Sequence, residues 1–372
     1  MIKQAGVKLD RMTAHWAEVS ARLNAGDDIE LPDELAARMP PQKWVREDYV
    51  RDVMTRRWGE RYLAYRELLR RASNYEVVPD HPIHIDFDLK DTCNLACINC
   101  SENYRQWSGT TLDVERLATD PLFKERKLMS ATLGNGTEPF LVPDAVFTLV
   151  EFLRAHDVIE IWFHTNGQLL TDEIIDGLIE HEVSWVGISM DALTEDTYRK
   201  MRGKGFRKMW TNAHRVLERR KQLGSPFPLV RVTATVSLEN MHELPDFFEY
   251  WKERVEMVEF QTFAAITPIG KPVVPHVAQS RHFEHLTGLS CSQPYWRLAV
   301  SAQGDVSPCC MSYGFLPELT VGNIFDGGMT LREVWESKKI QAIREDLKGG
   351  PRAFATCRQC LNSFYKLKYI KS

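Results

Sequence analysis

The sequence lacks the features that mark exported, membrane-spanning and nucleic-acid-binding proteins. Its first residues contain no apolar signal-peptide core, and no uncharged apolar run reaches about 18 residues, so we expect no membrane partner. The net charge of -4 argues against binding to nucleic acid. Because 44% of its 372 residues are hydrophobic and 26% are charged, the composition predicts a globular protein of the cytoplasm.

Cysteine is also too sparse for a disulfide framework. The chain has eight cysteines, and they fall into four groups: Cys93, Cys97 and Cys100; Cys291; Cys309 and Cys310; Cys357 and Cys360. Clustered cysteines in a long chain without an export signal are typical of metal sites in a reducing compartment. We therefore expect metal chemistry.

The hydrophobic pattern changes near residue 81. Residues 1–80 read as helices separated by breaks, and the arginine-rich stretch 51–71 fits a solvated helix face, so we assign it no chemistry. Beyond residue 81, short β-branched or alternating apolar runs are separated by amphipathic stretches, as in repeated βα units. We predict strands at 83–88, 128–133, 158–163, 184–189, 229–236 and 257–262.

These units predict an α/β fold with three parts. Residues 1–80 would form a helical N-terminal extension, residues 81–275 a partial (β/α)6 TIM-like barrel, and residues 276–372 a small C-terminal domain. In a parallel barrel, the loops that follow the strands emerge on one face and form the active site. Unusual polar clusters follow five of the six predicted strands: 93–100, 136–139, 165–167, 189–191 and 237–240.

The first of these clusters is a C-x3-C-x2-C triplet formed by Cys93, Cys97 and Cys100. Three thiolates on one short loop suggest a metal, and a [4Fe-4S] cluster held by three cysteines leaves one iron open. Zinc is an alternative, although its fourth ligand would have to be a distant residue such as His84. Unrelated buried thiols are another alternative.

The triplet resembles the signature of the radical S-adenosylmethionine (SAM) superfamily, although Asn99 stands where that superfamily often has an aromatic residue. The resemblance implies that SAM binds the open iron. Reductive cleavage would then yield methionine and a 5'-deoxyadenosyl radical, which removes a hydrogen atom from the substrate. It also implies a reductant of the flavodoxin or ferredoxin type.

The second cluster is similar to the Gly-Gly-Glu-Pro element of the same superfamily, whose backbone and carboxylate hold the amino group of SAM. Here it reads Gly136, Thr137, Glu138 and Pro139, with threonine in place of the second glycine. Pro139 keeps the preceding residue out of helical geometry, so we expect an extended backbone at that point. Without the cysteine loop, the same residues would be read as an ordinary turn.

Other residues on this rim also resemble SAM-binding positions. By that resemblance, Ser189 reaches the ribose of SAM and Arg202 pairs with its carboxylate, a partner that suits a guanidinium. Asn166, Ser237 and Asn240 would face the cofactor. Taken alone, Arg202 reads equally well as a helix-surface charge, and the segment around Asn166 as a turn.

A second cysteine set resembles the SPASM and twitch auxiliary-cluster domains. Cys291, Gly304 and Cys309 follow a C-x12-G-x4-C spacing, and Cys357 and Cys360 form a C-x2-C pair. The resemblance implies that these four cysteines hold a second [4Fe-4S] cluster. No cysteine follows Cys360, so the shorter twitch form with one auxiliary cluster fits better, although two cysteine pairs would also suit a zinc ribbon.

Cys310 is left over once four auxiliary ligands are assigned. It reads either as a small buried residue or as a hydrogen-atom donor to a substrate radical, which would make the reaction an epimerisation. Cys309 and Cys310 could also exchange roles.

The combined prediction is a radical SAM oxidoreductase that uses SAM and two [4Fe-4S] clusters. We expect two-electron oxidation of a carbinol or amine carbon in a small molecule such as an amino sugar or a cyclitol. Three alternatives stay open: an epimerase that uses Cys310, a maturase of a ribosomally made peptide, and a non-catalytic zinc-binding protein.

Overall fold

The computed structural model describes residues 19, 21–22, 25, 31–100, 107–134, 136–264, 280–310, 317–351 and 353–371. Within them, one sheet has the strand order β1-β7-β6-β5-β4-β3-β2-β10-β11-β12, and a smaller sheet has the order β8-β13-β9. The strands are β1 (Lys43–Val45), β2 (His84–Phe87), β3 (Ser130–Leu133), β4 (Glu160–Thr165), β5 (Trp185–Ser189), β6 (Leu229–Thr235), β7 (Met257–Gln261), β8 (Phe263–Ala264), β9 (Phe283–His285), β10 (Arg297–Val300), β11 (Asp305–Ser307), β12 (Gly322–Asn323) and β13 (Phe364–Leu367).

The six predicted strands correspond to β2 through β7, and each pairs in parallel with the next. Their boundaries differ from the predicted ones by a few residues. Side chains alternate between the two faces, so Ile85 and Phe87 pack in the core beneath the outer helices while His84 and Asp86 point to the inner face. The predicted α/β fold with a parallel sheet is confirmed.

The large sheet extends beyond these six strands at both edges. At one edge β1 pairs antiparallel with β7, so the predicted helical extension also contains a strand. At the other edge β10 pairs in parallel with β2, and β11 and β12 follow it. The extension and the C-terminal region are thus built into the same sheet as the barrel strands.

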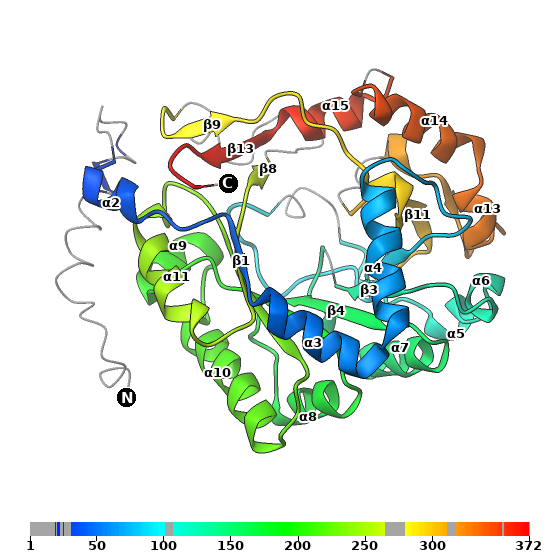
Figure 1. Cartoon of the computed structure of the whole chain (residues 1–372), viewed down its shortest axis with the longest axis horizontal. Coiled ribbons are helices and arrows are strands. Elements are labelled where there is room, and N and C mark those ends of the chain that lie inside the picture. The colour runs from blue at the N-terminus through cyan, green and yellow to red at the C-terminus, as the bar shows by residue number, and fades with distance from the viewer. Residues whose placement is uncertain are drawn as a thin grey trace.

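Helices cover the outer face of the sheet (Figure 1). They alternate with the strands, as the βα pattern predicts, and several begin at a side-chain cap such as Thr171 or Thr194. The helices of this part of the chain are α5 (Val114–Leu117), α6 (Pro121–Lys124), α7 (Pro143–Ala155), α8 (Asp172–Glu180), α9 (Glu195–Arg202), α10 (Phe206–Gln222) and α11 (Leu244–Lys252), with 3-10 turns η3 (Pro139–Leu141) and η4 (Met241–Glu243).

The N-terminal extension covers the amino end of the strands. It contains α2 (Asp33–Arg38), α3 (Glu47–Trp58) and α4 (Glu60–Ser73), and α3 and α4 lie across that end in Figure 1. Met54 and Tyr65 from these helices pack in one buried cluster with Trp185, Leu229 and Met257, the first residues of β5, β6 and β7. The Trp185 ring stacks on Trp162 with centroids 4.6 Å apart. This end of the barrel is therefore closed by apolar packing.

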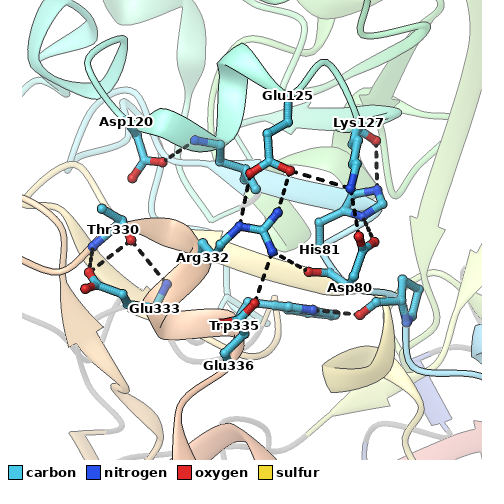
Figure 2. Close-up of polar contacts among 12 residues, drawn as sticks. Asp80, His81, Asp120, Glu125, Lys127, Thr330, Arg332, Glu333, Trp335 and Glu336 are labelled. Carbon is cyan, nitrogen blue, oxygen red and sulfur yellow. Dashed lines mark hydrogen bonds and ion pairs between the residues drawn. The ribbon is translucent and has the colours of Figure 1, made fainter.

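The C-terminal region is fastened to the barrel by polar contacts, which Figure 2 shows. Arg332 forms ion pairs with Glu125 and Glu336 and donates to the main-chain oxygen of Asp80. The helices of this region are α13 (Leu331–Trp335), α14 (Lys338–Lys348) and α15 (Ala355–Asn362), with 3-10 turns η5 (Gln293–Tyr295) and η6 (Pro317–Leu319). No helix among the described residues is both long and apolar enough to cross a membrane.

Candidate functional site

The carboxyl ends of neighbouring strands bring the predicted rim loops together. The backbone N–H of Glu138, after β3, donates to the carbonyl of Thr92 at 3.4 Å. The Asn166 side-chain amide, after β4, donates to the side-chain oxygen of Asn94 at 2.7 Å. The start of the cysteine loop, on either side of Cys93, is therefore tied to the loops that follow the next two strands.

Glu138 lies at the centre of this junction and is only 1% exposed. Its carboxylate accepts hydrogen bonds from the Thr165 hydroxyl at 2.8 Å, the Asn166 backbone N–H at 2.8 Å and the Phe140 backbone N–H at 3.2 Å. Burial raises the pKa of Glu138 to about 7. The carboxylate thus holds β3 and β4 together, and its contact with the amino group of SAM stays a prediction.

The other residues of this element are positioned by Asp88. Its Oδ1 accepts hydrogen bonds from the Gly136 backbone N–H and the Thr137 hydroxyl, both at 3.3 Å. Gly134 has a φ of +77°, and a Cβ there would lie 2.5 Å from the Pro139 ring. Asp88 was not among the predicted site residues, although an acidic side chain at the end of a predicted strand was a usable signal.

Arg202 is not a surface charge. Its Nε donates to Asp191 Oδ2 at 2.7 Å, and its Nη1 lies 3.8 Å from Cys97 Sγ. The side chains of Arg202 and Asp191 are 12% and 1% exposed. The structure thus places Arg202 beside the cysteine loop, while its predicted pairing with the carboxylate of SAM stays a prediction.

The remaining predicted rim residues surround this ion pair. The Asn240 amide donates to the backbone carbonyls of Asp191 at 2.8 Å and Thr235 at 2.9 Å, and its Oδ1 accepts the backbone N–H of Ser237 at 2.9 Å. Ser189 ends β5 and is half-buried. Asn240 therefore joins the loops after β5 and β6, and contacts of these residues with a cofactor remain predictions.

The three-cysteine loop offers a donor set that fits an iron-sulfur cluster. Cys97 is buried, whereas Cys93 and Cys100 are half-buried. Burial raises the pKa of the Cys93 thiol to about 11 and also raises that of Cys97. Because thiolates are the ligands, a metal must displace these protons when it binds. These cysteines would hold a cluster with one iron open to SAM.

The second cysteine set lies in a mainly apolar environment. Cys291, Cys309, Cys357 and Cys360 line one pocket, and the rest of its lining is Pro294, Pro308, Leu319, Ile343, Leu347, Thr356 and Leu361. Cys357 and Cys360 lie three residues apart on α15 and so share a face. Burial raises the pKa of Cys357 to about 12. Four thiols around one pocket are a complete ligand set for an auxiliary cluster.

The lining of this pocket also concerns the question of whether Cys309 or Cys310 is the cluster ligand. Cys309 lines it, whereas Cys310 is absent from the described lining and its backbone N–H donates to Gln293 Oε1 at 3.0 Å. Cys310 nevertheless lies close enough to Cys291 and Cys360 to affect their thiols, so the assignment of Cys309 as the ligand stays a prediction. Within the described ranges, no three His, Cys, Asp or Glu side chains are close enough to hold a single metal ion. In an iron-sulfur cluster each thiolate binds a different iron, so the cysteines need not lie close enough to bind one ion together.

The inner face of the sheet carries charged residues that the sequence reasoning missed. Arg297 on β10 donates to Asp86 on β2 at 2.7 Å, and Arg231 on β6 pairs with Glu259 on β7 at 2.5 Å. His164 on β4 is close enough to be affected by both arginines. Burial and the charge of Arg231 lower the pKa of His164 to about 3, so this imidazole is neutral at physiological pH. Polar residues at alternate positions of the predicted strands could have indicated this charged inner face.

Comparison with protein families identifies two domains. A model described as the radical SAM superfamily matches residues 89–250, which contain the three-cysteine loop and the rim residues. A model described as an iron-sulfur cluster-binding domain, named SPASM, matches residues 291–361, which contain the four-cysteine pocket. The two matched segments correspond to the two cysteine sites.

Curated relatives and a solved structure extend this similarity. The chain is 24% identical over 325 residues to the mycofactocin maturase MftC of Mycolicibacterium smegmatis, covering 78% of each protein. It is 25% identical over 324 residues to the AdoMet-dependent heme synthase of Methanosarcina barkeri, covering 72% of this chain and 87% of that protein. The structure of anSMEcpe with bound AdoMet superposes with a TM-score of 0.55 at 19% identity, covering 77% of this chain and 90% of that one. That likeness shows the fold.

Proposed function

Since the chain belongs to the radical SAM superfamily and carries an auxiliary iron-sulfur domain of the SPASM or twitch type, we propose that it oxidises a carbinol or amine carbon in a small polar molecule. An amino sugar or a cyclitol is the proposed substrate class. Its cofactors are SAM and two [4Fe-4S] clusters, which when bound supply a 5'-deoxyadenosyl radical and an electron acceptor. The reaction would remove one hydrogen atom, one proton and one electron from the substrate.

The four-cysteine pocket is the observation that carries this proposal. Its complete ligand set leaves no iron open for substrate, and its other lining residues are apolar apart from Thr356. A cluster in such a pocket is suited to exchanging electrons rather than binding substrate. An electron acceptor within the same chain is what a two-electron oxidation requires.

The inner face supports a small polar substrate. Its side chains include the Arg297–Asp86 and Arg231–Glu259 pairs, so the inner face carries both hydrogen-bond donors and acceptors. Hydroxyl and amine groups can satisfy both kinds of atom. Because α3 and α4 cover the amino end of the strands, we place substrate entry at the rim.

A second candidate function is modification of a ribosomally made peptide. It is favoured by the similarity to MftC, a protein named as a maturase, over 78% of both chains. For either function we propose a flavodoxin- or ferredoxin-type reductant and a cytoplasmic location. Epimerisation with Cys310 as the hydrogen donor is the remaining alternative.

The proposal is tested by anaerobic incubation of the reconstituted enzyme with SAM and a strong reductant. Amino sugars, cyclitols and candidate peptides are compared for substrate-dependent 5'-deoxyadenosine, first with wild type and then with Cys310→Ala. We expect a ketone or imine product from a small molecule and full activity of Cys310→Ala. Turnover with peptides alone would favour the maturase, and solvent deuterium at an inverted carbon would favour the epimerase.

A further inference from the structure

The last turn of α9 holds the three-cysteine loop through two consecutive residues. The carbonyl oxygen of Met201 accepts the backbone N–H of Ile98 at 3.0 Å. Next to it, Arg202 Nη1 points at the sulfur of Cys97 at 3.8 Å. Two contacts from adjacent residues fix the orientation of this loop relative to the helix.

The guanidinium of Arg202 is itself held in place by Asp191. Asp191 Oδ2 accepts its Nε at 2.7 Å, while Asp191 Oδ1 accepts the backbone N–H of Thr235 at 2.6 Å. The carbonyl of Asp191 accepts the Asn240 amide at 2.8 Å. Asp191 is thus bound on three sides, with a φ of +60°, a conformation that aspartate tolerates better than most residues. Arg202 cannot turn away from Cys97 without breaking this arrangement.

A positive N–H donor beside a cluster sulfur has a defined electrostatic effect. Reduction adds negative charge to the cluster, and hydrogen bonds to its sulfurs are among the factors that set its potential. A buried guanidinium should therefore stabilise the reduced form and raise the potential. No charged side chain is among the described residues that line the auxiliary pocket.

We infer that Arg202 is a positioning residue that tunes the SAM-binding cluster: held by Asp191, it donates to the Cys97 sulfur and raises the reduction potential of that cluster. This role does not require SAM. The inference rests on the superfamily membership and not on the proposed substrate, so it stands or falls separately from the proposed oxidation.

Two other roles for Arg202 make different predictions. If its ion pair with Asp191 only stabilises the fold, a substitution lowers stability but leaves the potential unchanged. If Arg202 serves only the carboxylate of SAM, the potential measured without SAM is also unchanged. A SAM-free potential therefore distinguishes the inferred role from both.

The test is an anaerobic redox titration of the cluster-loaded protein, followed by electron paramagnetic resonance without SAM or substrate. In Arg202→Gln, we expect the ratio of reduced to oxidised SAM-binding cluster at a fixed potential to fall about tenfold, or about 59 mV in midpoint. Arg202→Lys should shift the midpoint less, because lysine keeps the charge but not the fork of donors. The matched control Arg199→Gln changes an exposed arginine of the same helix, 66% exposed, and should cause no shift.

The auxiliary cluster provides a second control within the same molecule. Its signal is isolated in the triple variant Cys93→Ala, Cys97→Ala, Cys100→Ala, and adding Arg202→Gln should leave its midpoint unchanged. A wild-type midpoint in Arg202→Gln, or an equal shift in both clusters, would overturn the inference. If Arg202→Gln fails to retain the cluster, the midpoint potential of Arg202→Lys is measured in its place. A midpoint equal to that of wild type in Arg202→Lys would then contradict the inference.

Discussion

The two cysteine sites of this protein contain the same ligand atom in opposite surroundings. At the rim, Cys97 lies beside Arg202, which is paired with Asp191. In the C-terminal domain, the neighbours of Cys357 and Cys360 are mainly leucine, isoleucine and proline side chains. The first site has three cysteines on a loop beside charged groups, and the second has four around a mainly apolar pocket. We propose that these different surroundings suit the first site to binding a cofactor and the second to exchanging electrons.

The two sites also differ in the contacts that hold their cysteines in place. Side chains and backbone groups from the loops after β3 and β4 and from the last turn of α9 position the cysteine loop. The auxiliary cysteines depend on α15, whose first backbone N–H groups donate to Glu318 at 3.1 Å and 2.7 Å. Substitutions at the first site should therefore affect cofactor chemistry, and those at the second should affect product formation and local packing.

The largest expected effect comes from Cys97→Ala. Because Cys97 is one of only three predicted protein ligands of the SAM-binding cluster, its substitution should lower 5'-deoxyadenosine formation by more than about 100-fold. Chromatographic assay of 5'-deoxyadenosine measures this, with Cys310→Ala as the matched cysteine control. Continued SAM cleavage by Cys97→Ala would contradict the assignment of the first site.

Cys360→Ala should have a large effect of a different kind. We expect substrate-independent SAM cleavage to continue while the oxidised product is lost, since the electron acceptor is gone but the rim is intact. Iron and sulfide analysis should find one cluster per chain in place of two. Unchanged product yield with one cluster would show that the auxiliary site is not the acceptor.

Glu138→Gln should change how stability depends on pH. The pKa of Glu138 rises from its usual 4.5 to about 7, so the folded protein holds one more proton than the unfolded chain between these values. The free energy of unfolding should therefore fall as pH rises across this window, by up to about 3 kcal/mol. Glutamine cannot titrate, so the free energy of unfolding of the variant should not show this dependence on pH. Urea unfolding at several pH values measures it, and parallel curves for the two proteins would refute it.

The smallest expected effect is at Arg332, which joins the C-terminal region to the barrel. Arg332→Ala removes the ion pairs with Glu125 and Glu336 and should cost about 1 kcal/mol, because these partly exposed pairs form a network. Hydrogen exchange should rise in α13 while both clusters remain bound. Arg199→Ala is the control, with a change within about 0.5 kcal/mol. Equal effects of the two substitutions would mean that Arg332 does not fasten the C-terminal domain.

Much of this protein could be predicted from local sequence patterns. The alternation in 83–88 and the following segments placed all six parallel strands, because period-two patterning is local. The spacing of Cys93, Cys97 and Cys100 and of the auxiliary cysteines indicated both cluster domains, which the family matches confirm. Between residues 331 and 348 the chain forms two helices, α13 and α14, because the Ser337 side chain caps the start of the second.

The sequence by itself determined where the six strands of the βα units lie and the type of metal chemistry, since both depend on patterns within short stretches of chain. Only the tertiary structure decided that β1 and β10 join the barrel sheet, that Arg297 meets Asp86, and that Arg202 faces Cys97. Each of these pairs joins residues about a hundred or more positions apart. No local pattern specifies such a partner, because contacts of this kind form only when the whole sheet closes around them.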